Sequence, residues 1–424
     1  MRFLWQYHLK VRLNYTFGAF ITRYLDSFPM FLGTTVLMAD AISLHNVSQS
    51  NTSSPLLIYL PPFFDPGSGS GSGPGPVLPT FLKSFPTAVI NYRWPASSPD
   101  PNVPAASRHH GEGSKPAPPQ LWPTPLHDML FGYSWIVKNL SPSDSSRRDV
   151  YVYGSYLGAG LAAALALTEC YPHQQMAIRG LVAYNGIYNW TMFYSDHPIH
   201  KYRSEERLLS DAPDHPGSMF HYLKQRMPAL FPSPGDAFDP FASPSLFFHN
   251  PPLLVPDDFY ASTATSSFQK AVDELSLHPL NTENQDLATP LKAPRKGYLS
   301  FPPRTSPLKI PEALLLHETP PPPTRPARTR RSSGVVKKKR GWGENSFEVQ
   351  ATELASLMRR SVEKLELKER MKWDEDVENW EDEAEKRVQV ADVGRADAEA
   401  EIGVLGHDLI EEWLDERTGR VDER

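Results

Sequence analysis

The stretch Asp149-Val-Tyr-Val-Tyr-Gly-Ser-Tyr-Leu-Gly158 decides how this chain folds. Its first half is a short run of apolar and aromatic residues, typical of a buried β-strand, and its second half is a tight turn with a glycine at each end. The small aliphatic residues that follow, 159–168, predict a helix. The sequence therefore predicts a strand that passes through a sharp turn directly into a helix.

The turn has the frame Gly-x-Ser-x-Gly, in which a sharp strand-to-helix turn exposes a nucleophilic serine. Here the frame reads Gly154-Ser155-Tyr156-Leu157-Gly158, so a tyrosine holds the central position and the serine lies one place early. Tyr156 and Ser155 are therefore the candidate nucleophiles, and the backbone N–H of Leu157 is a candidate oxyanion donor. The pattern of the fold is present, but the residue that carries the chemistry is changed.

The rest of the chain alternates strands with helices. Apolar runs of strand length lie at 34–44, 55–60, 87–92, 178–184, 309–317 and 387–393, and helical spacing of apolar residues lies at 124–140, 345–365 and 402–413. This alternation predicts an α/β fold with a mostly parallel, doubly wound sheet. Two helix starts carry capping patterns, Thr124 before Pro125 and Asn345 three residues before Glu348, so we predict Thr124 and Asn345 as N-caps.

Composition divides the 424 residues into core and irregular segments. The 43 prolines are roughly twice the ordinary share and predict long irregular stretches, among them a Gly/Ser/Pro loop at 65–76. We expect an amphipathic segment at 1–33, the first half of the core at 34–189, a cap-like insertion at 190–308, a core strand at 309–319, a disordered linker at 320–344, and C-terminal helices with the last strand at 345–424.

Bulk properties exclude several function classes. A net charge of −6 argues against general nucleic-acid binding. The single cysteine, Cys170, excludes an intrachain disulfide and fits a reducing compartment, so we expect a cytoplasmic protein, with a nuclear or an organellar membrane-surface location as alternatives. No metal-ligand spacing, phosphate-cradling loop or dinucleotide fingerprint occurs, and we expect neither a metal nor a cofactor.

With this element order and the altered turn, the chain resembles the α/β-hydrolases, and in particular fungal esterase- and lipase-like proteins of the hormone-sensitive-lipase branch. The likeness covers most of 34–415 and is concentrated in 150–168, and Asp239-Pro-Phe-Ala-Ser-Pro244 is similar to an Asp-Pro-x-x-Ser-Pro stretch near that family's cap. Where the family has a His-Gly-Gly oxyanion turn, this chain has Pro61-Pro62-Phe63.

The resemblance also implies positions for the other catalytic residues. The family's acid follows the penultimate strand, where this chain has Glu318, and its histidine follows the last strand, where this chain has His407. The implied triad is Tyr156, Glu318 and His407. A phenol with a pKa near 10 is mostly protonated at neutral pH, and prolines have no backbone N–H to offer an oxyanion.

Two hypotheses of function therefore stay open. In the first, the chain is a catalytically degenerate hydrolase fold that binds a small apolar ligand or a protein partner in the old cleft, which Pro62, Ser155 and Tyr156 would line. The aromatic-rich insertion supports it, with Phe193, Tyr194, Phe231, Phe241, Phe247, Phe248, Phe259 and Tyr260. In the second, the chain is a working ester or thioester hydrolase with Ser155 or Tyr156 as nucleophile.

Two further segments carry interaction patterns. Residues 1–25 alternate basic with apolar side chains, which fits peripheral contact with a membrane surface, an organelle-targeting helix, or a helix packed on the domain. Ser333 follows Arg330-Arg331-Ser332, a pattern that basophilic kinases accept, and phosphate there would add about −2 charge to a basic run. The basic residues 337–340 fit a nuclear-import or acidic-surface patch, or a solvated linker.

Overall fold

The computed structural model describes residues 42–47, 54–62, 78–93, 121–143, 145–200, 218–231, 233–254, 294–319, 345–370, 372, 380–395 and 402–419. Several of the sequence predictions lie outside these residues: the amphipathic segment 1–33, Phe63, the loop 65–76, Phe259 and Tyr260, the linker 320–344 and Ser333.

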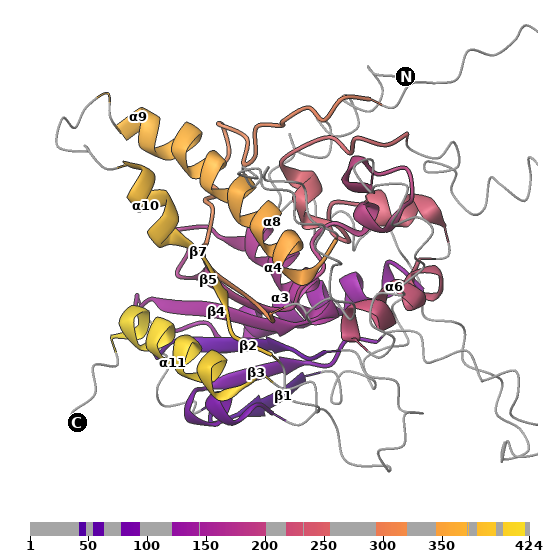
Figure 1. Cartoon of the computed structure of the whole chain (residues 1–424). Helices are drawn as coiled ribbons and strands as arrows, with labels where there is room; N and C mark the ends of the chain where they lie inside the picture. The colour runs from indigo at the N-terminus through magenta and orange to yellow at the C-terminus, as the bar shows by residue number, and fades with distance from the viewer. Residues whose placement is uncertain are drawn as a thin grey trace, which may run out of the picture.

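A seven-stranded sheet forms the centre of the molecule, in the order β1-β3-β2-β4-β5-β6-β7 (Figure 1). Neighbouring strands are parallel throughout, apart from β1, which runs antiparallel to β3. The predicted α/β class with a mostly parallel sheet is confirmed. The strands are β1 (Ile42–His45), β2 (Leu56–Leu60), β3 (Thr87–Ile90), β4 (Arg148–Ser155), β5 (Met176–Tyr184), β6 (Glu312–His317) and β7 (Val388–Asp392).

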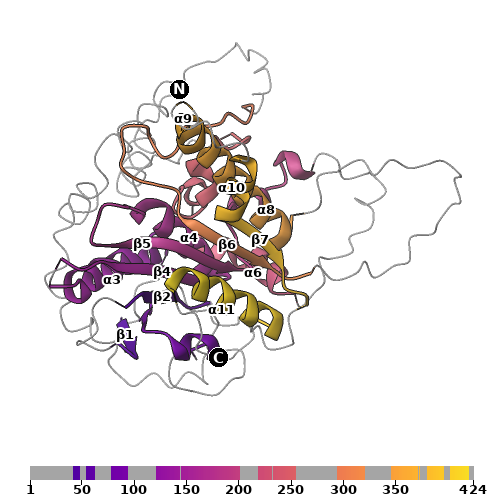
Figure 2. The ribbon, with the colours of Figure 1, turned by 90° about the vertical axis from the view of Figure 1, so that its left-hand side faces the viewer.

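Helices cover both faces of this sheet, which confirms the doubly wound arrangement. Tyr151 of β4 packs against Trp413 of α11, with ring centroids 6.0 Å apart, and α11 lies in front of the sheet in Figure 2. Gly154 points to the opposite face, toward the first turn of α4. The α-helices are α3 (Thr124–Leu140), α4 (Leu157–Glu169), α6 (Met219–Leu230), α8 (Phe347–Val362), α9 (Lys368–Arg370), α10 (Trp380–Arg387) and α11 (Val404–Thr418).

Both predicted N-caps are wrong. Thr124 is already inside α3, whose N-cap is Pro123, and no side chain caps this end. The N-cap of α8 is Ser346, whose Oγ accepts a hydrogen bond from the Val349 N–H at 3.3 Å. Asn345 is engaged elsewhere, because its Oδ1 accepts a hydrogen bond from Gln350 Nε2 at 2.9 Å.

The described parts of the predicted insertion are built from short helices rather than strands. Besides α6 they hold the 3₁₀ turns η4 (Trp190–Phe193), η5 (Pro198–His200), η6 (Pro234–Phe238) and η7 (Pro244–Phe247); η2 (Thr80–Ser84) and the π-helical η9 (Glu363–Leu367) belong to the core. We use "cap-like segment" below for residues 185–200, 218–231, 233–254 and 294–300. The domain boundaries given by the sequence stay predictions.

The Asp239–Pro244 stretch holds the cap-like segment together. Asp239 Oδ2 accepts a hydrogen bond from the Trp122 indole at 3.3 Å, while its Oδ1 accepts from the Phe241 N–H at 3.0 Å. The hydroxyl of Ser243 donates to the Ala237 carbonyl at 2.7 Å and accepts from the Trp190 N–H at 2.9 Å. The motif therefore serves to fix turns in this structure.

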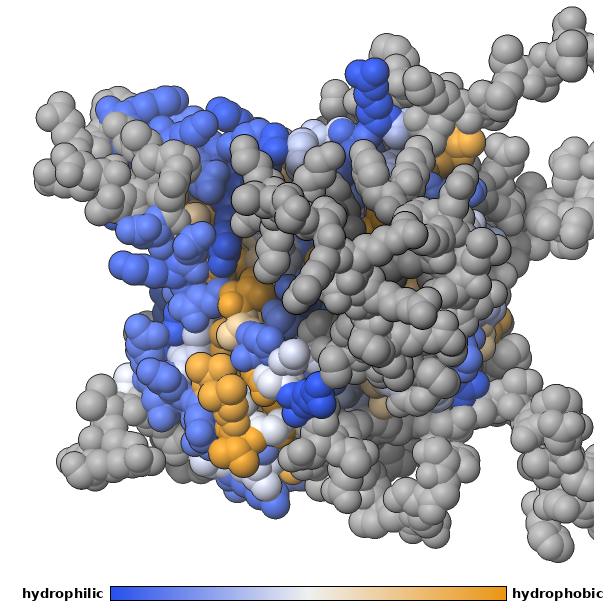
Figure 3. All heavy atoms as spheres, viewed as in Figure 1, coloured by the Kyte–Doolittle hydropathy of each residue, from blue (hydrophilic) through white to orange (hydrophobic). Residues whose placement is uncertain are grey.

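The surface is mostly polar on the side formed by the C-terminal helices. Figure 3 shows hydrophilic residues over α8 to α10 and a hydrophobic patch lower on the same face, toward α11. Val404 and Leu405, at the start of α11, are 76% and 54% exposed. None of the helices in the described ranges combines the length and apolar composition needed to span a bilayer.

A buried carboxyl group lies at the end of α4. All thirteen residues of this helix are buried, including its last, Glu169. Burial raises the pKa of Glu169 from 4.5 to about 8, because the charged form would be poorly solvated there. Between these two pH values the folded protein keeps the proton that the unfolded chain releases.

We predict that Glu169 makes stability fall as pH rises from about 4.5 to about 8. The folded state binds more protons than the unfolded state in this window, so the free energy of unfolding declines by up to about 1.4 kcal/mol per pH unit. Urea unfolding of wild type and Glu169→Gln across this range checks the sign. The substitution should flatten the slope, whereas the exposed Glu348→Gln should not; equal slopes for wild type and Glu169→Gln would contradict this.

The start of α4 lies very close to the end of β2. A Cβ atom on Gly158 would lie 2.2 Å from the Leu60 carbonyl oxygen and 2.7 Å from that of Pro61, both of them backbone atoms with little room to move. By contrast, a Cβ on Gly297 would meet its nearest neighbour, the Asn250 side chain, at 3.5 Å.

We predict that Gly158→Ala destabilises the protein by about 2 kcal/mol or more, because the new methyl group pushes α4 away from β2. Gly297→Ala should change the free energy of unfolding by less than about 0.5 kcal/mol. Denaturant unfolding of both variants measures the difference, and equal stabilities would show that α4 and β2 are not this close.

Candidate functional site

The strand-to-helix turn has the strained geometry of a nucleophile elbow. Central strand β4 ends at Ser155, α4 begins at Leu157, and Tyr156 between them has φ 53° and ψ −112°. A positive φ is rare for a bulky residue and persists only where the surroundings hold it. Here the Tyr156 N–H donates to the Tyr184 carbonyl at 2.9 Å, which ties the turn to neighbouring β5. Residue 156 therefore occupies the tip of the elbow.

The ring of Tyr156 is buried between two other aromatic side chains. Tyr184 meets it edge-to-face with ring centroids 5.6 Å apart, and Phe347 does the same at 5.8 Å. Phe347 is the first residue of α8, so the N-terminus of that helix covers the elbow. The Tyr156 residue is only 2% exposed. In this structure its ring serves as packing.

The polar end of Tyr156 faces groups at the ends of β5 and β6. Asn185 follows β5 with φ 49°, and its Oδ1 accepts a hydrogen bond from the Glu318 N–H at 2.9 Å. Glu318 follows β6, and its carboxyl is near enough to Tyr156 to oppose ionisation of the phenol. The structure therefore brings together two of the three triad residues implied by the sequence, Tyr156 and Glu318.

Both of these groups are biased toward their neutral forms. Burial raises the pKa of Tyr156, and the Glu318 carboxyl adds to this effect. The side chains of Asn185 and Tyr184 favour the phenolate, but the net shift of the Tyr156 pKa is upward. Burial also raises the pKa of Glu318, although Asn185 and His317 oppose this. An activated nucleophile needs its pKa lowered, so the shift at Tyr156 runs in the wrong direction.

His407 lies apart from this pair. It is half-buried near the start of α11, with its ring centroid 5.3 Å from that of Phe81. Phe81 in turn packs on Tyr153, on the face of the sheet that α11 covers. Within the residues that the structure describes, no hydrogen bond or ion pair joins His407 to Tyr156 or Glu318. A different histidine, His317, lies next to Glu318 at the end of β6 and is buried.

The predicted oxyanion turn presents acceptors rather than donors. Pro61 and Pro62 follow β2 and carry no N–H, and the Pro61 carbonyl accepts a hydrogen bond from the Tyr92 hydroxyl. The carbonyl oxygens of Leu60 and Pro61 are also the atoms that a Cβ on Gly158 would meet first. Of the predicted oxyanion residues that the structure describes, Leu157 alone keeps a suitable donor, because its N–H is the first of α4 and has no partner within the helix.

Ser155, the other candidate nucleophile, is not at the tip of the elbow. It is the last residue of β4, pairs with Tyr184 across the parallel ladder, and is 5% exposed. Gly154 and Gly158 occupy the positions expected of the two elbow glycines, since a Cβ on Gly154 would lie 2.5 Å from the Gly158 carbonyl oxygen.

A continuous series of ring contacts leads from the elbow into the cap-like segment. Each ring meets the next with centroids 5.0–5.8 Å apart, in the order Tyr156, Phe347, Phe220, Phe193, Trp190, Phe231 and Trp122. The sequence pointed to Phe193 and Phe231 as aromatic residues of the insertion. It missed Tyr184, Asn185 and Phe347, although Asn185 directly follows an apolar strand, where the side chains of a parallel sheet converge.

We compared the chain with known proteins. No family model matches it, and no curated protein matches it in sequence. Among solved structures it is similar to carboxyl esterase 2 of the fungus Tuber melanosporum, with 10% identity over 89% of this chain and 80% of that one and a TM-score of 0.39. It is also similar to a fungal esterase from Rhizomucor miehei, with 12% identity, 97% and 99% coverage and a TM-score of 0.38.

The Francisella virulence factor BioJ gives comparable values, with 8% identity, 90% coverage of this chain, 82% of that one and a TM-score of 0.36. TM-scores this low carry no argument about activity. The fold therefore rests on features of this chain itself: the sheet order, helices on both faces, and the elbow with Tyr156 at its tip. Together these make it an α/β-hydrolase-like fold.

We predict that the ring of Tyr156 matters for stability far more than its hydroxyl. Tyr156→Phe keeps the contacts with Tyr184 and Phe347 and should cost about 1 kcal/mol. Tyr156→Ser leaves a cavity at the start of α8 and should cost about 3–4 kcal/mol. Urea unfolding of the two variants tests this, and a serine variant as stable as the phenylalanine variant would show that the ring does not pack as described.

Proposed function

We propose that this chain is an α/β-hydrolase-fold protein that has lost acyl transfer and acts by binding, with a small apolar ligand or a protein partner as its occupant. The observation that carries the proposal is Tyr156 at the tip of the elbow, 2% exposed and packed between Tyr184 and Phe347. A nucleophile in this fold has to reach a carbonyl carbon in the cleft. A ring enclosed by two others does not reach one.

The other requirements of acyl transfer point the same way. This chemistry uses a base that removes the nucleophile's proton, a carboxylate that orients the base, and preorganised donors for the oxyanion. The histidine that the resemblance implies as the base, His407, packs on Phe81 instead of joining Tyr156. Glu318, the candidate acid, has a raised pKa. Pro61 and Pro62 remove two backbone donors, and the loss of a single donor ordinarily costs a factor on the order of 10²–10³ in rate.

The character of the occupant follows from the rings between the elbow and the cap-like segment. These side chains are aromatic, so a ligand that entered among them would be apolar. Because each ring already packs on the next, a ligand has to displace existing contacts, whereas a protein partner binds without entering. The effect of decanoate on the melting temperature of the protein distinguishes these two occupants. A rise in melting temperature supports a small apolar ligand, and no change supports a protein partner.

The alternative is an active ester or thioester hydrolase that uses Ser155 or Tyr156. The retained elbow geometry and the N–H of Leu157, the first of α4, favour it, because both belong to a working site of this fold. Such an enzyme would require the start of α8 to withdraw from Tyr156. The branch of the family, a cytoplasmic location and membrane contact through residues 1–25 stay predictions from the sequence.

We predict that a fluorophosphonate probe does not modify the protein, as measured by intact-mass spectrometry, under conditions that fully label a known serine hydrolase mixed into the same sample. Hydrolysis of p-nitrophenyl butyrate should remain at the rate of a heat-denatured sample. A stoichiometric adduct that disappears in Tyr156→Phe or Ser155→Ala would overturn the proposal and establish the hydrolase. Both variants keep the size of the residue nearly unchanged, which limits damage to the fold.

A further inference from the structure

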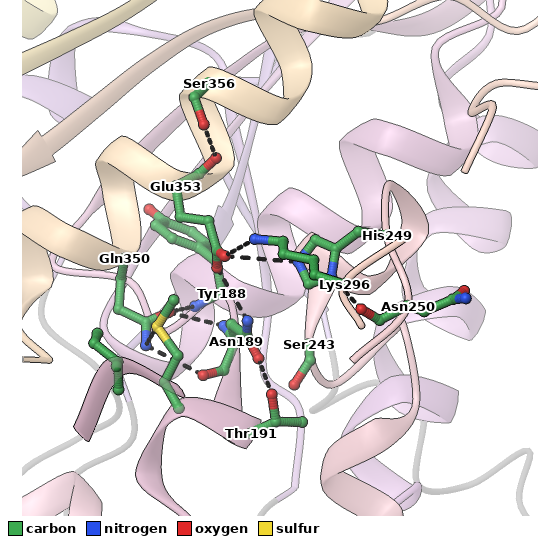
Figure 4. A network of polar contacts seen from close by, with 12 residues as sticks. Tyr188, Asn189, Thr191, Ser243, His249, Asn250, Lys296, Gln350, Glu353 and Ser356 are labelled. Carbon is green, nitrogen blue, oxygen red and sulfur yellow. Dashed lines mark hydrogen bonds and ion pairs between the residues drawn. The ribbon is translucent and has the colours of Figure 1, made fainter. Parts of the chain in front are cut away.

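A single carboxylate of α8, Glu353, whose side chain is 10% exposed, joins this helix to three parts of the cap-like segment (Figure 4). Glu353 Oε1 accepts a hydrogen bond from Lys296 Nζ at 2.7 Å, and Glu353 Oε2 accepts one from Asn189 Nδ2 at 3.0 Å. The Nε2 atom of His249 lies 3.6 Å from the same Oε1. An ammonium, an imidazole and an amide, from segments far apart in sequence, therefore meet on one side chain of α8.

The neighbouring turn of α8 holds the same region by its backbone. Gln350 Oε1 accepts hydrogen bonds from the N–H groups of Tyr188 and Asn189, at 3.0 and 2.8 Å, and Gln350 Nε2 donates to the Asn189 carbonyl at 3.2 Å. Phe347, which covers Tyr156, lies one turn further toward the start of the helix. The face of α8 that covers the elbow also carries the contacts to the cap-like segment.

An acceptor lies beside each ring nitrogen of His249. Its Nδ1 lies 2.8 Å from the Asn250 carbonyl oxygen, and its Nε2 faces the Glu353 carboxylate. Burial alone would raise the pKa of Glu353, but His249 and Lys296 outweigh it and hold that pKa far below its usual range, so the carboxylate is charged. A carbonyl and a carboxylate only accept, so the form that suits both neighbours is the imidazolium, whose Nε2–H faces Glu353 as an ion pair at 3.6 Å rather than as a hydrogen bond.

We propose that doubly protonated His249, with Lys296 and Glu353, forms a protonation-dependent latch that holds the cap-like segment on α8. When Nε2 loses its proton, a donor becomes a lone pair directed at a charged oxygen inside the protein, and the contact turns from attractive to repulsive. Lys296 and Asn189 keep their bonds to Glu353, so the latch loosens rather than disappears. The proposal does not depend on whether the elbow is catalytic.

The latch acts on a short pair of extended segments. The Asn250 N–H donates to the Gly297 carbonyl and the Leu299 N–H donates to the Phe248 carbonyl, both at 2.8 Å. His249 and Lys296 lie within this pair, which we call the latch ribbon (residues 248–250 and 296–299). Loosening the contact with Glu353 should therefore raise the exchange rates of the ribbon's amide hydrogens.

Two other histidines lie in the same region and do not reproduce this arrangement. His197 is buried, its Nδ1 accepts a hydrogen bond from the Ile199 N–H at 3.2 Å, and burial lowers its pKa to about 4. It is therefore neutral at pH 6 and above. His200 contacts the Met192 carbonyl with Nε2 at 2.9 Å. The charged and titratable groups near His249 are Glu353, Lys296, which shares the Glu353 carboxylate, and His197.

Hydrogen exchange of the full chain tests the latch, after correction for the intrinsic pH dependence of exchange. In the wild type, protection of the ribbon amides should fall at least tenfold between pH 6 and pH 9. Glu353→Gln should lower ribbon protection at pH 6 and remove most of this pH dependence. The exposed Glu348→Gln on the same helix should behave as wild type. Ribbon exchange that is independent of pH in the wild type would overturn the proposal.

Two further measurements test the latch if Glu353→Gln folds poorly. The Lys296 side chain is 27% exposed, and Lys296→Gln should raise the exchange rates of the ribbon amides while amides of the central strands keep wild-type exchange. An equal loss of protection in the ribbon and in the central strands would mean general destabilisation and would refute a latch. In the wild type, ¹⁵N NMR of His249, assigned by its absence in His249→Gln, should show both ring nitrogens protonated at pH 6. A single protonated nitrogen would refute the latch directly.

Discussion

The packing of the Tyr156 ring between Tyr184 and Phe347 is the contact on which the rest of this structure depends. It joins the end of β5, the tip of the elbow and the start of α8 in one buried cluster. The backbone at Tyr156 is strained, and a strained residue stays in place only where its neighbours hold it. The ring supplies that restraint here, so the side chain that replaces a nucleophile also stabilises the turn that would present one.

Helix α8 transmits this contact to the cap-like segment. Phe347 packs on the elbow, and Gln350 binds the backbone after β5. Glu353 contacts Asn189, Lys296 and His249. These three side chains of α8 succeed one another at intervals of three residues and share one face of the helix. Access to the elbow and the position of the cap-like segment are for this reason coupled through one helix, whatever the occupant of the cleft.

Local patterns predicted much of the fold. Alternation of apolar strands with helices indicated the parallel sheet, and the frame of two glycines around residues 155–157 located the elbow, because backbone spacing at such a turn admits only glycine. Asn345 was a wrong prediction of a cap, since Ser346 offers an equally good oxygen one residue later and the amide of Asn345 is taken by Gln350. The capping pattern alone does not show which of two neighbouring residues caps the helix.

The site itself was only partly predictable for the same reason. Glu318 follows the end of a strand, and strand ends of a parallel sheet converge, so its proximity to Tyr156 could be anticipated. His407 was placed by counting elements, but its helix face turns toward Phe81. The role of Phe347 depends on its contact with Tyr156, nearly two hundred residues away in the sequence. The chemistry of His249 depends on the two acceptors that lie beside its ring nitrogens. No local sequence pattern predicts either arrangement.

The most direct test of the central claim is the ionisation of the Tyr156 phenol, measured as the difference in ultraviolet absorbance between wild type and Tyr156→Phe during a titration from pH 6 to pH 11. The account predicts that Tyr156 ionises only at a higher pH than an exposed tyrosine, because burial, and the nearby Glu318 carboxyl, raise its pKa. A phenolate that forms near neutral pH would contradict the account and would identify Tyr156 as an activated nucleophile.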